Sequence, residues 1–494
     1  MGSIVFREFF SLFFSVLNII NYLFAFFIVY YERRNIGATW AWLIVVLITP
    51  YFGFIFFLLF GLDARKHKVF YDKAHRDNKT YKEMLIDTEN SFTDVISQTD
   101  YKSETSILGA AYSSKVNDMI YLNYISGGSF LTKNNAVQMF HTGNDKFTSL
   151  LADIESAKHF IHIQYYIFRN DNLGQRLIKV LAKKASEGIE VRLLVDGMGN
   201  YKNGKKFYNE LVAAGGELGV FMPPYFIRIN FRNHRKLCII DGAIGYIGGF
   251  NVGDEYLGEV RRYGNWRDTH IKVIGDAVKE MQIRFMMDWA FVRNETLPFN
   301  ELYLPKIDKP IGTANMQIVS SGPDSFWSSI QYGYTKMISE ASKNIFIVTP
   351  YFVPDDSIFE SLRIAALSGV DVRIIIPANP DHIFVYGASL SYLGALIAAG
   401  VKCYKYENGF VHSKLLMIDG LISSVGTANM DLRSFKLNFE INAFIYDEEA
   451  TKEMEREFFN DLEHCTLISS EWYNNRPLIT RCKEAVGRLI SPLL

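Results

Sequence analysis

Two long stretches without a charged residue lie near the start of the chain. The first, FFSLFFSVLNIINYLFAFFIVYY, runs between Glu8 and Glu32, and the second extends from Asn35 to Leu62. A helix rises about 1.5 Å per residue, so each stretch is long enough to cross a hydrocarbon core of about 30 Å. Soluble helices of this length normally carry a charged face, which disfavours a pair of buried core helices. The pattern predicts two transmembrane helices within residues 1–68, joined as a hairpin.

The charges that flank these stretches predict the orientation of the hairpin. The short loop holds Arg33 and Arg34, whereas a longer basic series follows the second stretch: Arg65, Lys66, Lys68, Lys73, Arg76, Lys79 and Lys82. Because basic residues are enriched on the cytoplasmic side, the large C-terminal part is expected in the cytoplasm. Pro50 and Gly53 leave a second arrangement open, in which the second stretch kinks or re-enters the membrane.

After a polar connector, predicted over residues 69–130, alternating strand and helix patterns occur twice. AKHFIHIQYYIF, beginning at Ala157, resembles SKNIFIVTPYFV, beginning at Ser342; each is a β-rich run that follows an amphipathic helix. ASEGIEVRLLVD and ALSGVDVRIIIP match in the same way further on. The order of elements therefore predicts an α/β protein with two duplicated domains, residues 131–305 and 306–494, packed around a pseudo-two-fold axis.

Composition narrows the function classes. The 494 residues carry a formal net charge of -1, so no overall positive charge favours a nucleic acid partner. The four cysteines show no C-x-x-C spacing and no matching histidine pairs, which argues against a zinc site or a disulfide framework. Any attraction for anions must come from local groups.

Each half also contains one copy of a second repeat that carries candidate chemistry. NHRKLCIIDGAIGYIGGFN begins at Asn233 and VHSKLLMIDGLISSVGTAN begins at Val411. In an extended chain His234 and Lys236 project from the same face, whereas Asp241 lies about 16 Å further along at about 3.3 Å per residue. Asp-Gly is a strong signal for a two-residue hairpin turn, which would return Asn251 to the histidine.

The turn also predicts a strand register. If Asp241 and Gly242 form the turn, Ile240 pairs with Ala243, and counting back sets His234 opposite Gly249. The second copy has the same spacing. It predicts a turn at Asp419 and Gly420, His412 opposite Thr427, and Asn429 beside the site.

This set of residue types suits a phosphate diester. Histidine can act as nucleophile or proton donor near neutral pH, and lysine supplies positive charge for the non-bridging oxygens. Asparagine adds hydrogen-bond donors. One His-x-Lys copy is weak evidence, but two matching copies in a duplicated fold predict a single site at the interface of the two halves. Attack would then come from one side of the phosphorus, and protonation of the leaving oxygen from the other.

Both motifs resemble the signature of the phospholipase D superfamily, H-x-K-x4-D followed by G-[GS/T]-x-N. The matching residues are His234, Lys236, Asp241, Gly248 and Asn251 in the first copy, and His412, Lys414, Asp419, Gly426 and Asn429 in the second. Within that superfamily, ERRN, WAWLIVVLITPYFGFIFFLLFG, GGFNVGDEY, GTANMDLRSF and NFEINAFIYD resemble the bacterial cardiolipin synthases. This resemblance covers essentially the whole chain.

The resemblance implies an enzyme of the bacterial cell membrane that acts on membrane lipids. It would transfer a phosphatidyl group from one phosphatidylglycerol to another and release glycerol, without a metal or organic cofactor. The candidate catalytic residues are His234, Lys236, Asp241, His412, Lys414 and Asp419. His234 is assigned as nucleophile and His412 as acid/base, although the near-equivalent copies do not decide the order. The family pattern also implies acidic residues that orient the histidines, for which Asp268 and Glu440 fit.

Other interpretations stay open at this level. A hydrolytic phospholipase D or another transphosphatidylase would use the same residues, and an inactive membrane-anchored lipid-binding scaffold would keep the fold alone. The chain can also form a homo-oligomer. Residues 478–490 have apolar positions at helical spacing, with Arg481, Lys483 and Arg488 beside them. Such a helix either packs on the domain, which we favour, or lies on the membrane.

Overall fold

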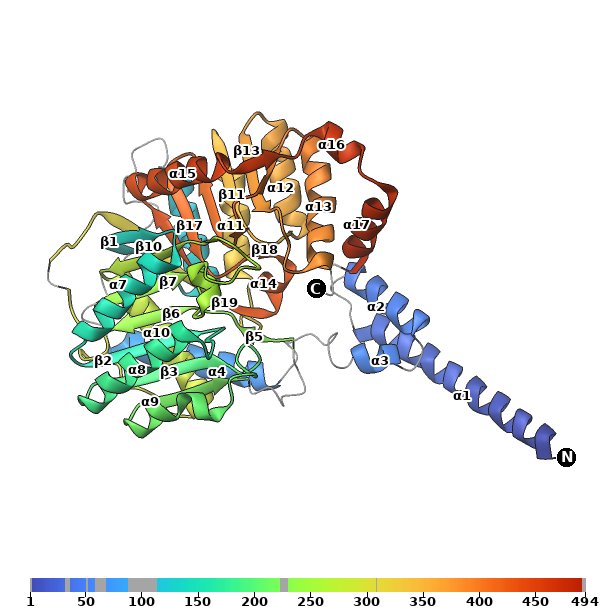
Figure 1. Ribbon diagram of the computed structural model, residues 1–494, viewed down its shortest axis with the longest axis horizontal. Coiled ribbons are helices and arrows are strands. Elements are labelled where there is room, and N and C mark those ends of the chain that lie inside the picture. Colours follow the sequence, from blue (N-terminus) through green and yellow to red (C-terminus); the bar gives the residue numbers. More distant parts are fainter. Residues whose placement is uncertain are drawn as a thin grey trace.

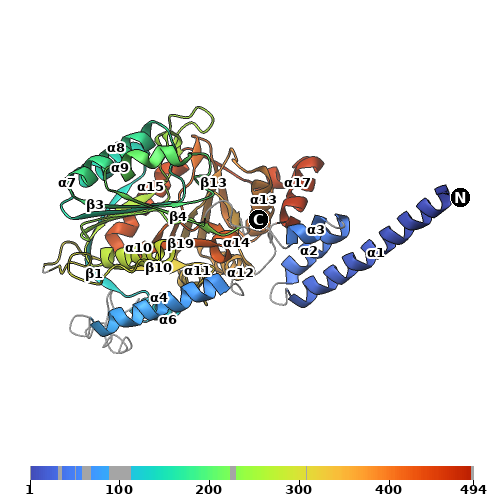
Figure 2. The same ribbon diagram turned by 90° about the horizontal axis from the view of Figure 1, so that it is seen from below.

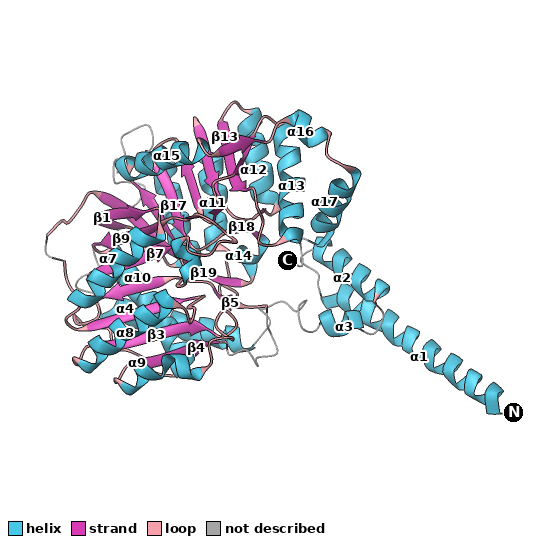
Figure 3. Cartoon of the chain, in the orientation of Figure 1, coloured by secondary structure: helices cyan, strands magenta, loops and turns pink. Residues whose placement is uncertain are grey.

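A single mixed sheet with helices on both faces forms the body of the computed structural model, and three apolar helices extend from one side of it (Figures 1 and 2). The structure describes residues 2–31, 36–49, 52–57, 68–87, 113–222, 230–307 and 309–490. Strands and helices alternate along the body, as Figure 3 shows by colour.

The sheet repeats the same strand order outward from its centre. In the first half the order is β1 (Thr132–Phe140), β9 (His270–Ile274), β7 (Ile244–Gly248), β6 (Leu237–Ile240), β2 (Phe160–Tyr165), β3 (Glu190–Asp196), β4 (Glu217–Phe221). In the second half it is β10 (Ala314–Ser321), β19 (Asn438–Tyr446), β17 (Ile422–Gly426), β16 (Leu415–Ile418), β11 (Asn344–Val348), β13 (Asp371–Pro377), β14 (Lys402–Tyr406). Antiparallel pairing of β1 with β10 joins the halves, and β20 (Cys465–Leu467) extends the second edge. The predicted duplicated α/β architecture is confirmed.

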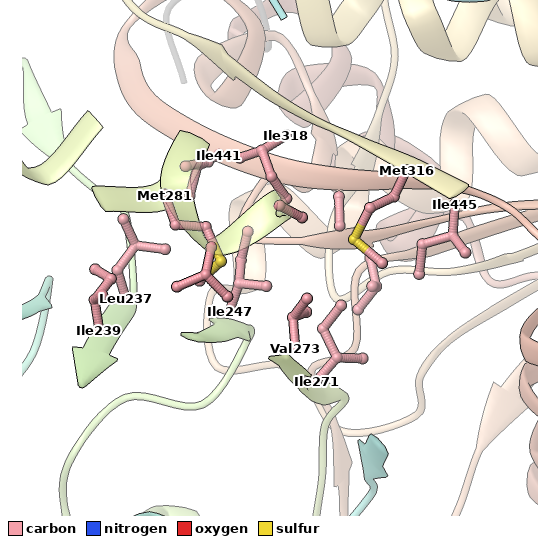
Figure 4. Packing of buried hydrophobic residues seen from close by; sticks show 14 of the residues in the cluster. Leu237, Ile239, Ile247, Ile271, Val273, Met281, Met316, Ile318, Ile441 and Ile445 are labelled. Atoms are coloured by element: carbon pink, nitrogen blue, oxygen red, sulfur yellow. The ribbon is translucent and has the colours of Figure 1, made fainter. Parts of the chain in front are cut away.

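The two halves share one hydrophobic core where they meet. Leu237, Ile239, Ile247, Ile271 and Val273 come from strands of the first half and pack in the same cluster as side chains of the second half: Met316, Ile318, Ile441 and Ile445 (Figure 4). Burying apolar side chains stabilises a fold by about 1.5–3 kcal/mol for each large residue. The halves are therefore held together by burial of apolar surface as well as by the β1–β10 ladder.

Helices cover the sheet in equivalent positions of each half. The helices of the first half are α7 (Gly143–Ser156), α8 (Asn172–Ser186), α9 (Asn209–Ala213) and α10 (Ala277–Arg293). Those of the second are α11 (Ser329–Glu340), α12 (Asp356–Leu367), α13 (Ile383–Ala398), α14 (Leu432–Lys436), α15 (Glu448–Leu462), α16 (Ser470–Asn474) and α17 (Leu478–Ile490). Asp171 and Asp355 begin α8 and α12 as N-caps, accepting hydrogen bonds from the N–H groups of Gly174 and Ile358. The duplication thus extends to local helix signals.

The N-terminal stretches fold differently from the predicted pair of full-length spans. The first forms one continuous helix, α1 (Gly2–Tyr31), and Arg7–Tyr30 is the only segment of the described residues long and apolar enough to cross a membrane as one helix. The second is broken into α2 (Ile36–Ile48) and α3 (Phe52–Phe56). At about 1.5 Å per residue, a helix of the 13 residues of α2 is too short for a hydrocarbon core of about 30 Å.

Local chemistry explains the break. Helix α2 ends just before Pro50, and proline lacks an N–H group and disfavours helical geometry at the preceding residue. Pro50 itself lies outside the described residues, as do the loop arginines Arg33 and Arg34. Gly53 then lets α3 fold back on α2, since a Cβ at this glycine would lie 2.6 Å from Cα of Val46.

The connector is largely helical where the structure describes it, with α4 (Lys68–Asp87) and α6 (Ser113–Gly127). Lys73 of α4 is buried and forms ion pairs of 2.6 Å with Asp77, 2.7 Å with Asp324 and 3.5 Å with Asp288. Asp288 in turn contacts Arg235 at 2.6 Å. Buried charges and one buried aromatic residue, Phe70, attach α4 to the body in place of a regular apolar stripe, so hydrophobic periodicity did not predict this helix.

Candidate active site

Both motif histidines line one cavity of about 600 Å³ between the two halves. His234 and His412 are each 9% exposed, and Asn251 and Asn429 lie in the same wall. The prediction that the two copies build one site agrees with this placement, because residues of both halves enclose the cavity.

Two short parallel strand pairs bring each histidine to the opposite half. Strand β5 (Arg232–Asn233) pairs with the start of β19, and His234 N–H donates to the carbonyl of Phe439 at 2.9 Å. Strand β8 (Trp266–Arg267) pairs with β15 (Phe410–Val411), and His412 N–H donates to the carbonyl of Arg267 at 2.7 Å. Each histidine therefore directly follows a paired segment, and the residue after the paired segment of the opposite strand is acidic: Glu440 after Phe439, and Asp268 after Arg267.

These acids, Glu440 and Asp268, contact the histidines across the interface. Nδ1 of His234 lies 2.9 Å from Oε1 of Glu440, and Nδ1 of His412 lies 2.7 Å from Oδ2 of Asp268. Both carboxylates are completely buried. Because each carboxylate accepts the Nδ1 proton, Nε2 is the ring nitrogen that remains available for chemistry in the cavity. Each histidine is paired with the acid of the other copy.

Burial and neighbouring charge set the protonation of the site. Burial lowers the pKa of His234 and of His412 to about 4, although Glu440 and Asp268 act in the opposite direction. Burial would raise the pKa of Glu440 and Asp268, but the adjacent histidines and lysines hold both below their usual values. At neutral pH the imidazoles of the site are therefore neutral and are held by ionised carboxylates.

The motif lysines lie directly beside the histidines. Lys236 Nζ donates to the carbonyl of His234 at 2.7 Å, and Lys414 Nζ donates to that of His412 and lies 2.9 Å from its Nδ1. Arg235, between the first pair, points away and binds Asp288. The predicted alternation is confirmed: the lysines supply positive charge at the histidines, and the arginine stabilises the interior.

The asparagines lie in the cavity wall and form hydrogen bonds within it. Asn251 accepts a hydrogen bond from Ile167 N–H and donates to the hydroxyl of Tyr256, at 3.1 and 3.0 Å. Asn429 donates to Oδ2 of Asp431 at 3.1 Å. Both line the cavity, so they shape its wall while keeping polar atoms near the histidines.

The aspartates of the motifs lie away from the cavity, at the hairpin turns. Asp241 and Asp419 adopt left-handed backbone conformations, with φ of 52° and 56°. Asp241 accepts hydrogen bonds of 2.8–2.9 Å from three successive N–H groups at the start of β2, those of residues 158–160. Asp419 accepts the equivalent bonds from residues 342–344 at the start of β11. Their grouping with the catalytic residues thus receives no support from contact with the histidines.

The strand register is shifted by one residue from the prediction. Ala243 N–H does donate to the carbonyl of Ile240 at 3.1 Å, which closes the expected turn, but the ladder pairs Ile240 with Ile244. The second hairpin pairs Ile418 with Ile422 in the same way. The predicted pairing of Ile240 with Ala243 was therefore wrong, because each turn is followed by an extra residue that sequence spacing does not reveal.

Asp241→Asn and Asp419→Asn are expected to weaken folding more than catalysis. Asparagine tolerates the left-handed backbone, but it loses the charge that strengthens the hydrogen bonds from three N–H groups. We expect a loss of about 1–3 kcal/mol of stability and a kcat of the folded enzyme within about threefold of wild type. Thermal unfolding in detergent and activity of the folded fraction measure both. Loss of activity at wild-type stability would contradict the turn role.

The cavity also contains residues that the sequence analysis did not select. Tyr166 and Tyr351 occupy the same position in the two copies of the first repeat, and both line the cavity. The ring of Tyr166 lies 5.0 Å from that of His234 between centroids. The presence of a tyrosine at this position in both copies is the sequence feature that could have identified Tyr166 and Tyr351. His382 lies in the cavity wall as well.

The activity is expected to fall on the alkaline side as the motif lysines lose their protons. Burial lowers the pKa of Lys236 to about 7 and that of Lys414 to about 8, so their charge is present below these values and lost as the pH rises through them. Since kcat/KM reports the free enzyme, it should decline from about pH 7 to 8 upward. In Lys236→Arg and Lys414→Arg this decline should move to higher pH, because arginine stays charged. An unchanged alkaline limb in both variants would disprove the assignment.

Comparison with known proteins identifies the family to which the chain belongs. Residues 150–289 and 334–462 match a family model described as "Cardiolipin synthase, PLD-like domain", and residues 19–61 match "Phospholipase_D-nuclease N-terminal". Each matched part of the first model contains one of the two histidine motifs.

Full-length relatives agree with the family model. The chain is 46% identical to a cardiolipin synthase of Listeria monocytogenes over 97% of its own length and 98% of that protein. It is also 46% identical to the "Major cardiolipin synthase ClsA" of Bacillus subtilis, over 98% and 99%. A crystal structure of phosphatidylserine synthase from Haemophilus influenzae shares the fold, with a TM-score of 0.58, 16% identity, and coverage of 77% of this chain and all of that one. The chain therefore belongs to the cardiolipin synthase family, a phosphatidyltransferase family of the phospholipase D superfamily.

Proposed function

We propose that this enzyme transfers a phosphatidyl group from one phosphatidylglycerol to another, giving cardiolipin and glycerol through a phosphatidyl-histidine. The observation that carries the proposal is the pairing of two histidines with buried carboxylates from opposite halves in one cavity. Two imidazoles serve a two-step transfer, because one can bond to phosphorus while the other moves the proton of the alcohol.

In the first step, Nε2 of His234 attacks the phosphorus of the donor lipid. A P–N bond forms as the bond from phosphorus to the glycerol oxygen breaks, and His412 gives a proton to that oxygen. Binding of an anionic phosphodiester raises the pKa of a nearby imidazole, so His412 can carry this proton although burial favours its neutral form. Lys236 and Lys414 stabilise charge on the non-bridging oxygens.

In the second step, the primary hydroxyl of another phosphatidylglycerol takes the place of glycerol. His412 accepts the hydroxyl proton, a new P–O bond forms, and the P–N bond to His234 breaks. The enzyme returns to its starting protonation state, and no oxidant, reductant or further co-reactant is required. The carboxylates of Glu440 and Asp268 keep Nε2 of each histidine directed at the reaction.

Purified enzyme and labelled phosphatidylglycerol in vesicles test this function. Cardiolipin and glycerol in equal amounts are expected. Phosphatidic acid without cardiolipin would assign a hydrolase, in which water replaces the second lipid. Release of labelled glycerol with a phosphatidyl product on another alcohol would assign a different transphosphatidylase. Absence of any turnover would support a lipid-binding scaffold.

We further propose that the apolar N-terminal helices anchor the chain in the membrane and that the catalytic body lies in the cytoplasm. Helix α1 is long enough to cross the membrane, the apolar helix α2 packs beside it, and the basic series in the sequence after α3 favours the cytoplasmic side. A cysteine replacing the exposed Val212 of α9 tests the orientation with a membrane-impermeant maleimide. Labelling in inverted vesicles but not in intact cells is expected, and the reverse pattern would place the body outside.

A further inference from the structure

Helix α17 packs on the body with its polar side, whereas an amphipathic helix normally buries its apolar side. Its buried residues are Glu484, which forms two 2.7 Å hydrogen bonds with Arg476, and Gly487. Its apolar side chains point outward instead. With the first residues of α13 they form a surface that we call the outer patch, each member 49% to 74% exposed: Ile383, Phe384, Leu478, Ile479, Val486 and Leu489.

A close helix crossing joins the two parts of the outer patch. A Cβ at Gly487 would lie 2.8 Å from the carbonyl oxygen of Phe384 and from the N of Ala388, so the backbones of α17 and α13 touch there. The crossing brings the part of α17 that carries Val486 and Leu489 close to the first turn of α13, which carries Ile383 and Phe384. The exposed apolar residues of these two segments are therefore neighbours rather than scattered single positions.

The outer patch adjoins the mouth of the active-site cavity. His382 and Val385 line the cavity, and Ile383 and Phe384 lie between them in the chain at the start of α13. At the start of α13, His382 and Val385 thus face the cavity, whereas Ile383 and Phe384 face outward. Anything that covers the outer patch would lie at the entrance through which a substrate reaches the histidines.

The position of the outer patch and the charged residues around it indicate what covers this surface. Both views show α17 next to α2, on the side of the body from which α1 extends (Figures 1 and 2). Arg481 and Lys483 flank the apolar positions of α17 and are exposed, and Arg488 is exposed although its guanidinium lies 4.0 Å from the ring centroid of Tyr392. The acidic residue of the helix, Glu484, is buried in its pair with Arg476. A helix with outward apolar residues and a cationic border suits the surface of an anionic bilayer.

We propose that the outer patch of α13 and α17 docks on an anionic lipid bilayer and sets the cavity mouth against it. The lipid headgroup would then pass from the bilayer along the first turn of α13 to the histidines, without full extraction of its acyl chains into water. This inference rests on the proposed function only in taking a membrane lipid as the substrate. The docking itself does not require catalysis.

The native cysteines allow a direct test on the full chain. Cys482 of α17 is exposed, Cys238 and Cys403 are buried, and Cys465→Ser removes the half-buried fourth thiol. In this background Cys482 carries a fluorescent label, and the protein is reconstituted in phosphatidylglycerol vesicles with brominated phosphatidylcholine as quencher. The matched control carries Cys465→Ser, Cys482→Ser and Val212→Cys, with its label on α9 on the far side of the body (Figure 1).

Quenching at Cys482 at least about twofold stronger than at the control position is expected from insertion at the headgroup boundary. Equal quenching at the two positions would overturn the proposal. Weak quenching together with cross-linking of Cys482 between chains would also overturn it, in favour of a second copy of the chain as the partner. Neither readout depends on turnover, so failure of the proposed reaction and failure of docking are distinguishable.

A functional comparison adds a second criterion. Val486→Asp with Leu489→Asp should lower the rate on phosphatidylglycerol in vesicles about tenfold or more, because charge opposes insertion of the patch. The rate on dispersed short-chain phosphatidylglycerol should stay at the wild-type value, and Val486→Leu with Leu489→Ile should behave as wild type on both. An equal loss on vesicles and dispersed lipid would contradict docking.

Discussion

His234→Ala and His412→Ala are each expected to abolish the formation of cardiolipin. One variant lacks the atom that bonds to phosphorus, and the other lacks the group that protonates the departing glycerol. Losing proton transfer alone costs about 10²–10⁴-fold in rate, and losing the nucleophile removes the pathway. Product assays with labelled phosphatidylglycerol should therefore fall to about 10⁻² of wild type or lower for both variants, at unchanged thermal stability. Activity above this level in either variant would contradict a site shared by both motifs.

An activated donor distinguishes the two histidines. A phosphatidyl ester of p-nitrophenol releases an anion that needs no proton, so the first step can proceed without the general acid. If His234 is the nucleophile, His412→Ala should release p-nitrophenol in a burst and retain a labelled phosphatidyl group on the protein, whereas His234→Ala should do neither. The opposite pattern would exchange the two roles. A burst in neither variant would argue against a covalent intermediate.

The parts of the site that repeat along the chain could be predicted from the sequence. His234 and His412 were identified because each lies in a matching motif at the same place in a duplicated half, and the alternation of His234, Arg235 and Lys236 followed from strand geometry. Their convergence on one cavity also followed from the duplication. These inferences need only local order and symmetry, which a sequence carries directly.

The crossed pairing of the acids could not be predicted in that way. Asp268 and Glu440 each follow a histidine motif within their own half, yet each contacts the histidine of the other half. The pairing depends on the bridges of β5 with β19 and of β8 with β15, short segments without a hydrophobic pattern. Contacts between distant segments depend on how the halves pack, and periodicity contains no information on that.

The hydrophobic pattern also fails to show the specific contacts that determine how α4 and α17 pack on the body. Lys73 attaches α4 through buried ion pairs, which a hydrophobic pattern does not detect. The apolar spacing of α17 correctly predicted a helix, but the usual rule that the apolar face is buried gave the wrong side, because Gly487 and the pair of Glu484 with Arg476 decide which face meets α13. Both cases show specific contacts overriding an average preference.

Glu440→Gln is expected to lower kcat about 10²–10⁴-fold with a smaller effect on KM. Glutamine keeps the shape of the side chain, but it removes the charge that raises the pKa of His234 and can donate a hydrogen bond to Nδ1, which selects the wrong tautomer. The phosphate-binding charges of Lys236 and Lys414 remain, so substrate binding should change little. Without the carboxylate, the pKa of His234 should fall below its value of about 4.

The activated donor makes this substitution a test of the crossed pairing itself, with Asp268→Asn as the matched variant. If Glu440 serves His234, the nucleophile, the loss of rate in Glu440→Gln should remain when p-nitrophenol replaces glycerol as the leaving group. If Asp268 serves His412, the loss in Asp268→Asn should largely disappear in the p-nitrophenol burst and reappear in transfer to the second lipid. Were each acid to act on the histidine of its own copy, the two variants would exchange these behaviours. The variant that keeps the p-nitrophenol burst therefore carries its substitution in the acid that serves His412. This identifies which half of the duplicated fold supplies the acid to each histidine.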